Sequence, residues 1–448
     1  MAQHAQHRNN QQPSKQEDLK SHTRKLWVLA TVPFIMVLGN SMLIPVLPKM
    51  MKVMHLSLFQ VGLLITIFSI PAGIIIPFAG ALSDHVGRRV IMTPALLVYG
   101  IAGLGAGISA WIIPHPYPWI MGFRLLQGIG AGGTYQLAMA VAGDMFQSEK
   151  RAGALGTLEA ANGLGKVISP IAGSALALIV WFAPFFVYGL LSFPIAAGIW
   201  FLIKEPKNQK VEGGMSQYWK GLATTFKTKT GSILTTFLGG AVVLFVLFGV
   251  LSYLADILEK NFGYGEFTRG LVIAIPVLAS AVMSYISGTV LQKRLAQWSR
   301  PIVVIGMGLI ALAMVIEPFF ATTNPYLAIG ILVIQGIGTG SVLPSINTLV
   351  TSATSSKERG VVTSLYGSVR FFGVAMGPPI FAMAMTHRYL TFWGAAALAA
   401  VTAVLSWFFI NEKLMLPKNL RGGGSGGGVR TMSESRSKTD RKSRSPVR

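Results

Sequence analysis

The chain contains no cysteine, and only 12% of its 448 residues are charged, about half the share found in an ordinary soluble domain. The missing cysteines exclude disulfides, thiol catalysis and cysteine metal sites. The seven histidines are scattered without the spacing of metal ligands, so we predict neither a metal nor another cofactor. Because the chain also lacks a Ser-His-Asp set, a phosphate-cradling loop and an ATP-binding motif, we predict that it is not an enzyme and that nucleotide hydrolysis does not drive it.

Long apolar runs fill most of the chain, in which 52% of the residues are hydrophobic. A run of about 18 or more apolar residues is long enough to cross the hydrocarbon core of a bilayer. Such runs recur at residues 26–47, 58–82, 90–112, 118–142, 152–180, 184–203, 233–255, 268–291, 301–320, 326–350, 361–385 and 390–411. We therefore predict an all-α integral membrane protein with 12 transmembrane helices. An even number of helices places both termini on one side.

Acidic residues are scarce beside basic ones, since 16 Asp and Glu stand against 38 Lys and Arg, a formal charge of +22. The basic residues concentrate in both tails, in the 204–229 stretch and in the loops on the same side as the tails. Lys49, Lys52 and the 259–269 loop are exceptions on the opposite side. The positive-inside rule then places both termini in the cytoplasm. A basic surface against anionic lipid explains this charge better than nucleic-acid binding does, so we predict the lipid bilayer as a partner and no nucleic acid.

The chain divides into two similar halves. Gln127-Gly-Ile-Gly-Ala-Gly132 recurs as Gln335-Gly-Ile-Gly-Thr-Gly340, at an offset of 208 residues (335 minus 127). The pairs Arg151 and Arg359, Pro170 and Pro378, and Gly80 and Gly288 share this offset, which indicates an internal repeat. We predict a disordered N-terminal tail (1–25), a six-helix bundle (26–203), a cytoplasmic linker (204–232), a second six-helix bundle (233–411) and a flexible basic tail (412–448).

Four stretches carry a family resemblance. The turn Gly80-Ala-Leu-Ser-Asp-His-Val-Gly-Arg-Arg89 lies between two uncharged apolar runs, so its charges must lie at a membrane surface. It resembles the loop between helices 2 and 3 of the major facilitator superfamily. Leu38–Pro48, Arg124–Gly133 and Gly165–Ser174 are similar to motifs in helices 1, 4 and 5 of the 12-helix drug:proton antiporters of that superfamily. In the last motif, Ser169 and Ser174 stand where glycine is usual.

The resemblance implies two pseudo-symmetric six-helix bundles with the substrate site between them. It also implies a conformational gate at Gly80, Asp84, Gly87, Arg88 and Arg89. Asp84 can pair with Arg88 or with another cytoplasmic cation, and such contacts would hold the two halves together on the inner side. The alternative is a charged loop that only sets the topology.

The helix-5 motif predicts close packing. Gly165 and Gly173 allow another helix to approach, and Pro170 removes a backbone hydrogen bond and favours a bend. A purely structural role is the default interpretation.

Hydropathy places five charged residues within the bilayer, namely Arg124, Glu159, Lys166, Glu317 and Arg370. Charge is expensive in a bilayer and by default marks a functional site. By resemblance, Arg124 is the arginine linked to proton coupling, although snorkelling is an alternative. We predict Glu159 as the proton carrier, because burial disfavours an ionised carboxylate whereas a nearby cation favours it. A constant ion pair of Glu159 with Lys166 or Arg370 is the alternative, and Glu317 is more typical of an interface.

Polar and aromatic side chains on the same helices are candidates for the substrate cavity, although each could instead hydrogen-bond between helices. They are Asn40, Gln127, Tyr135, Gln136, Asn162, Gln335, Asn347 and Tyr366.

The resemblance predicts a secondary transporter that exports small molecules by proton antiport and alternating access, with multidrug efflux as the first candidate. A dedicated exporter of a metabolite or siderophore is the alternative, since Lys166 and Arg370 suit an anionic or catecholate cargo. A lipid flippase and a proton-coupled uptake symporter are further alternatives. We expect a monomer in a bacterial inner membrane.

Overall fold

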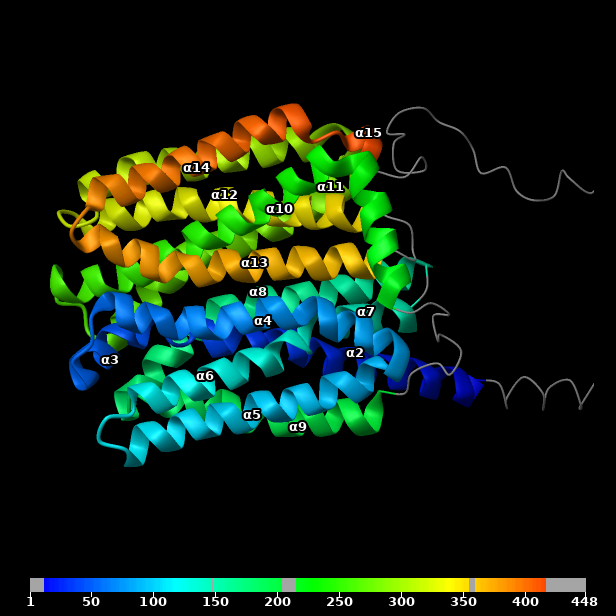
Figure 1. Cartoon of the computed structure of the whole chain (residues 1–448), viewed down its shortest axis with the longest axis horizontal. Helices are drawn as coiled ribbons and strands as arrows, with labels where there is room; N and C mark the ends of the chain where they lie inside the picture. Colours follow the sequence, from blue (N-terminus) through cyan, green and yellow to red (C-terminus); the bar gives the residue numbers. More distant parts are fainter. Residues whose placement is uncertain (1–11, 147, 204–214, 354–358, 416–448) are drawn as a thin grey trace, which may run out of the picture.

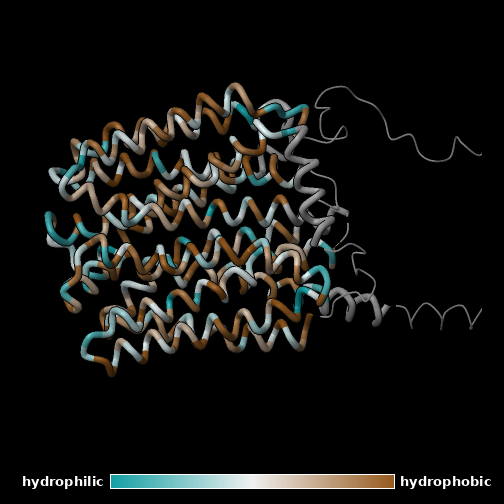
Figure 2. The backbone as a smooth tube through the Cα atoms, viewed as in Figure 1, coloured by the Kyte–Doolittle hydropathy of each residue, from teal (hydrophilic) through white to brown (hydrophobic). Residues whose placement is uncertain are grey.

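The computed structural model describes residues 12–146, 148–203, 215–353 and 359–415, and the regular secondary structure in these ranges is helical. Figure 1 shows one bundle of helices, with α15 and the beginning of α2 at the same end. We name this the terminal end, and we name the opposite end, which carries α3, the distal end. Hydrophilic residues gather at both ends of the bundle and apolar ones along its length (Figure 2), as a bilayer-spanning protein requires.

The described residues of the first half form nine helical elements. They are α2 (Gln12–Ser41), η1 (Ile44–Val46), α3 (Leu47–Met54), α4 (Leu58–Val86), α5 (Arg88–Ile112), α6 (Tyr117–Gly132), α7 (Tyr135–Met145), α8 (Ser148–Ile179) and α9 (Ala183–Leu202). The helix α2 begins at Gln12, inside the stretch 1–25 for which the sequence predicts a disordered tail. Hydropathy marks the chain only from Leu26, but the Gln, Lys and Glu residues before it are good helix formers that extend the helix. Residues 1–11 lie outside the described ranges.

The second half forms α10 (Met215–Lys260), α11 (Glu266–Phe320), α12 (Pro325–Ser352), α13 (Arg359–Ala382), η2 (Met383–Met385), α14 (Arg388–Phe409) and α15 (Glu412–Met415). Part of the predicted linker is helical, because α10 begins at Met215 and leaves helical geometry only at Lys229. The long α11 contains two spans, Glu266–Gly288 and Trp298–Phe320. Residues 204–214 of the linker and 416–448 of the tail lie outside the described ranges.

The described ranges contain 11 helices that are long and apolar enough to cross a membrane. The remaining predicted span, residues 118–142, is divided between α6 and α7 at Gly133 and Thr134, whose backbone angles leave the helical region. Successive glycines are poor helix formers, and the two at 132 and 133 precede this break. The structure thus has the all-α architecture of 12 spans that the sequence predicts.

The internal repeat is visible in the packing of glycines. A side chain at Gly128 on α6 would clash with the carbonyl oxygen of Phe68, and one at Gly336 on α12 would clash with that of Pro276. Both the glycines and their partners are 208 residues apart (336 minus 128 and 276 minus 68). Equivalent helices therefore make equivalent close approaches in the two halves, as small residues at helix interfaces allow.

The halves meet along two seams. On one, α4 packs against α13, where Thr66 Oγ1 donates a 2.6 Å hydrogen bond to the Ala375 carbonyl and the rings of Phe68 and Phe371 lie 6.5 Å apart. On the other, α8 packs against α11, and a Cβ at Gly270 would lie 2.6 Å from the Pro170 carbonyl oxygen. The seams leave a cavity between the halves at mid-bundle.

Candidate functional site

Arg124 is the centre of a buried polar cluster in the first half. Its side chain is 0% exposed. The guanidinium donates from Nε to the Leu64 carbonyl (3.0 Å) and from Nη1 to the Gly39 carbonyl (2.8 Å). It lies 4.5 Å above the ring of Phe68. One side chain thus joins α2, α4 and α6.

Two side-chain amides complete this cluster. Nη1 of Arg124 donates to Gln127 Oε1 at 2.9 Å, and Nη2 donates to Asn40 Oδ1. Asn40 in turn donates to Ser69 Oγ at 3.2 Å. No carboxylate pairs with Arg124 among the described residues. Gln127, a predicted cavity residue, belongs to this cluster and does not line the cavity.

The cavity between the halves is lined by α2, α4, α6, α7 and α8 from the first half and by α10 and α13 from the second. Its volume is about 90 Å³. Six of the predicted cavity and coupling residues line it: Asn40, Tyr135, Gln136, Asn162 and Lys166 from the first half and Arg370 from the second. Aromatic side chains complete the wall, among them Phe68, Phe248 and Phe371.

Lys166 and Arg370 bring two cationic groups to this cavity from opposite halves. Lys166 lies on α8 and Arg370 on α13, and both are half-buried. Within the described ranges, no carboxylate oxygen lies within the 4.0 Å of an ion pair from either group. Arg370 stacks over the ring of Tyr366 at 5.4 Å, and its Nε has no hydrogen-bond partner among these residues. The lining residues include no Asp or Glu.

Glu159 lies directly behind the cavity wall. Its Oε1 accepts a 2.7 Å hydrogen bond from the hydroxyl of Tyr135, which itself lines the cavity. Neither Lys166 nor Arg370 makes an ion pair with it in the described structure. The carboxylate is therefore one hydrogen bond removed from the cavity and is partly exposed.

The charged residues of the predicted gate lie at the terminal end and contact their own half. Arg88 reaches both Asp84, at 3.3 Å from Nη2, and Asp144 at the end of α7. Arg89 donates to the carbonyl oxygens of Trp200 (3.1 Å) and Ile203 (3.3 Å) on and just after α9.

Two glycines of the gate motif have distinct roles in the geometry. Gly87 separates α4 from α5 with φ 104°, a conformation that favours glycine. Gly80 is the motif residue in contact with the second half, since a Cβ there would lie 2.9 Å from Ser364 Oγ on α13.

The helix-5 motif packs within the first half. A side chain at Gly173 would clash with the Met42 carbonyl oxygen, and a Cβ at Gly165 would lie 3.2 Å from that of Phe34. Both partners lie on or just after α2. Pro170 is instead on the interface, because its carbonyl oxygen faces Gly270 of α11.

Four further candidates lie away from the cavity. Gln335 is buried and donates to Thr339 Oγ1 of its own helix at 2.9 Å. Asn347 and Tyr366 are not among the lining residues, and the ring of Tyr366 packs against Phe237 at 5.6 Å. Glu317, which is more typical of an interface, is instead 1% exposed, with an Oε2 that has no hydrogen-bond partner in the described structure.

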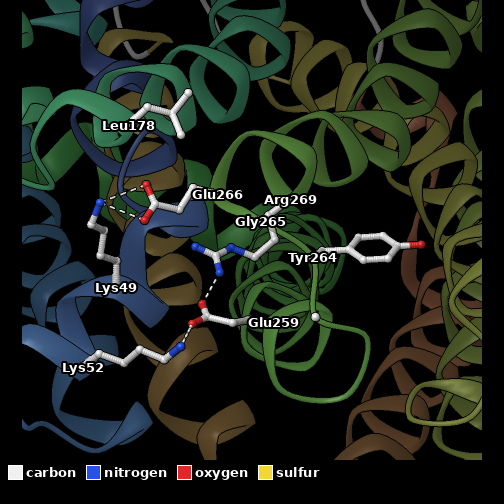
Figure 3. Close-up of a pocket in the computed structure, with 9 residues that line it drawn as sticks. Lys49, Lys52, Leu178, Glu259, Tyr264, Gly265, Glu266 and Arg269 are labelled. Carbon is white, nitrogen blue, oxygen red and sulfur yellow. Dashed lines mark hydrogen bonds and ion pairs between the residues drawn. The ribbon is translucent and has the colours of Figure 1, made fainter.

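Sequence reasoning did not assign a cluster of charges at the distal end. Lys49 Nζ lies 2.8 Å from Glu266 Oε1, and Glu259 pairs with both Lys52 and Arg269. Figure 3 shows these side chains converging from the two halves around a hollow of about 510 Å³. The sequence does contain a signal for this cluster, because Lys49, Lys52 and the 259–269 loop are the charged exceptions on the side opposite the basic loops. Within the described ranges, no cluster of His, Asp and Glu could hold a metal ion.

Comparison with known proteins places this geometry in context. The model of the Major Facilitator Superfamily matches residues 29–378 and 297–443. The chain is 38% identical to the bacillibactin exporter of Bacillus subtilis, over 86% of this chain and 95% of that protein. It is 29% identical to the multidrug efflux protein YfmO of the same organism, over 84% and 90%. A crystal structure of a D-xylose–proton symporter shares the fold, with a TM-score of 0.69, 14% identity and coverage of 88% and 99%.

Proposed function

The chain belongs to the Major Facilitator Superfamily and is therefore a multi-pass membrane transporter of small molecules and not an enzyme, and from this premise we propose that it exports small organic anions through the central cavity by alternating access. The membrane is a bacterial cell membrane, as the Bacillus relatives suggest. Lys and Arg gather in the loops of the terminal end, so this end and both termini face the cytoplasm by the positive-inside rule.

The observation that carries the proposal is the pair of cations in a cavity without a carboxylate. Lys166 and Arg370 line the space, and the described lining residues contain no Asp or Glu. Two like charges at membrane depth are costly, and Glu159, whose charge attracts both, forms an ion pair with neither in the described structure. An anionic cargo supplies a partner of opposite charge, and the rings of Phe68, Phe248 and Phe371 offer apolar and aromatic contact to the rest of it.

The size of the cavity requires movement. Ligand sites of proteins usually have volumes of about 300–1,000 Å³, whereas this one measures about 90 Å³. The cargo therefore enters a wider form of the cavity, and the present form has the halves drawn together around it. Rocking of the two six-helix halves about the central site supplies such a change.

The membrane potential favours the export of an anion. In a cell with a negative interior, each elementary charge that crosses the membrane changes in free energy by about 2.3 kcal/mol per 100 mV. An anion that leaves moves down this gradient. The similarity to the bacillibactin exporter supports a dedicated metabolite, such as a siderophore, as the cargo.

A second candidate is proton antiport of cationic compounds, as in multidrug efflux. Glu159 favours it, because a carboxylate that binds either a proton or a cationic cargo exchanges one for the other. Its hydrogen bond to Tyr135 connects it to the cavity, and the similarity to a multidrug efflux protein agrees with it. The two cations of the cavity oppose this candidate, because they repel a cationic cargo.

Inverted membrane vesicles test the proposal, since exported cargo accumulates inside them. We expect a lumen-positive potential, imposed without a pH gradient, to drive the uptake of a catechol carboxylate (dihydroxybenzoate) but not of ethidium. The Glu159→Gln variant should retain this uptake. Accumulation of ethidium alone, driven by a pH gradient and lost in Glu159→Gln, would replace the proposal with the second candidate.

A further inference from the structure

Five charged side chains at the distal end connect the two halves of the molecule. Lys49 and Lys52 lie on α3 of the first half, whereas Glu259 lies near the end of α10 and Glu266 and Arg269 lie in the first turns of α11 in the second half. Figure 3 shows the two lysines on one side of the cluster and the acidic residues and Arg269 on the other. We name these five residues the distal cluster.

The contacts of the distal cluster cross between the halves at three points. Lys49 Nζ lies 2.8 Å from one carboxylate oxygen of Glu266 and 3.0 Å from the other. Lys52 pairs with Glu259. Arg269 pairs with Glu259 within its own half and donates from Nη2 to the Pro45 carbonyl oxygen of the first half at 3.1 Å. Glu259 thus receives one cation from each half.

The contacts of the distal cluster differ in how far their side chains are buried. The side chain of Arg269 is 2% exposed and that of Glu259 is 14% exposed, whereas that of Lys52 is 70% exposed. Ion pairs of exposed side chains contribute little, because water and salt screen them. Loss of one partner from a buried pair has a larger effect, because the remaining charge is left without compensation. The side chains of Lys49 and Glu266 are 29% and 24% exposed, so their pair and the contacts of Arg269 contribute more to the attraction than Lys52 does.

The seam between α8 and α11 is tight at the distal end. There, Gly270 of α11 lies against Pro170 and Ser174 of α8. The cross-half contacts of the distal cluster therefore lie beside a close approach of the two helices.

We propose that the distal cluster is a latch, whose cross-half contacts hold the distal end closed and break each time the cavity opens toward that end. The latch rests on the proposed alternating access and extends it, because it assigns the closure of one end to named residues. Its alternative is a static fastening that stays intact in every state. The two differ in the parent chain: a latch that opens and closes gives both a short and a long distance across the distal end, whereas a static fastening gives the short distance alone.

The absence of native cysteine makes the latch measurable. Cysteines introduced at Val53 on α3 and at Asn261 just after α10, both exposed, accept spin labels on either side of the cluster. Double electron–electron resonance then reports the distance between the halves at the distal end. No transport is needed for this reading, so a failure of the proposed cargo or driving force leaves it interpretable.

Charge reversal tests whether these contacts hold the distal end closed. We expect Lys49→Glu or Glu266→Lys alone to raise the fraction of long distances by about tenfold, and Lys49→Glu combined with Glu266→Lys to restore the short distance. Lys260→Gln is the matched control, because Lys260 pairs at the same end with Asp256 of its own half. We expect it to change nothing.

Four results would overturn the latch: the short distance alone in the parent chain, unchanged distances in both single reversals, no restoration in the combined variant, or an equal opening in Lys260→Gln. A single variant that fails to fold does not obscure the outcome. The milder Glu266→Gln removes the pair without introducing repulsion, and it should shift the distances in the same direction by a smaller factor.

Discussion

The guanidinium of Arg124 is a buried positive charge in the first half, and its hydrogen-bond acceptors among the described residues are uncharged. Its four acceptors are two backbone carbonyls and the side-chain oxygens of Gln127 and Asn40. No described carboxylate is present whose protonation could alter this arrangement. We therefore infer that Arg124 holds α2, α4 and α6 in register behind the cavity. Asn40 accepts a hydrogen bond from Arg124 and also lines the cavity, so it connects the buried cluster to the cavity.

Replacement of Arg124 by leucine should destabilise the protein. It leaves the acceptors buried without donors, a cost of about 1–3 kcal/mol for each group that finds no other partner. We expect a lower thermal midpoint for Arg124→Leu in detergent, followed by tryptophan fluorescence, and an intermediate value for Arg124→Lys. An unchanged midpoint together with lost transport would show that Arg124 acts in coupling and not in holding the helices.

Charged residues of the site could be found from the sequence because each interrupts a long apolar run. Lys166 and Arg370 stand out in this way, and both line the cavity. Uncharged polar residues were harder to place, because helix rotation decides which face they occupy. Gln127 and Gln335 are polar residues within apolar spans, as the cavity residues are. The structure shows that Gln127 instead accepts a hydrogen bond from Arg124 and that Gln335 donates one to Thr339.

At the scale of the helices, close backbone contact sets the position of α8. A side chain at Gly173 would clash with the Met42 carbonyl oxygen just after α2, whereas one at Gly156 of the same helix would meet no described atom outside it within 4 Å. We expect Gly173→Leu to lower the thermal midpoint and the yield of folded protein. Gly156→Ala is the control on the same helix and should match the parent, because alanine is the better helix former. Equal behaviour of the two variants would contradict the packing.

Helix positions were predictable from hydropathy, but helix continuity was not. The spans 268–291 and 301–320 were predicted with a loop between them, whereas the backbone is helical through Glu266–Phe320. Conversely, the apolar run 118–142 is divided between α6 and α7. Hydropathy reports which residues the bilayer accepts and not where the backbone hydrogen bonds continue or stop.

At the scale of the whole molecule, the repeat of 208 residues predicts two equivalent halves, but each half carries residues that the other lacks. The counterpart of Arg124 is Leu332, and that of Asn162 is Arg370 (332 minus 124 and 370 minus 162). The buried arginine cluster therefore belongs to the first half alone, whereas the cavity takes one cation from each half. The contact of Lys49 with Glu266 spans 217 residues of sequence, which no local pattern could pair.

The central claim is that the cavity holds its cargo through Lys166 and Arg370, and binding to the purified protein tests it most directly. Isothermal titration calorimetry would compare dihydroxybenzoate with neutral catechol, for the parent chain, Lys166→Gln, Arg370→Gln and Lys413→Gln. Lys413 is exposed on α15 and serves as the control for charge alone. We predict that each cavity variant binds the carboxylate about tenfold more weakly, a difference of about 1.4 kcal/mol. Neutral catechol should bind the variants and the parent alike, and Lys413→Gln should match the parent. Equal affinity of the parent and both cavity variants for the carboxylate would contradict the claim.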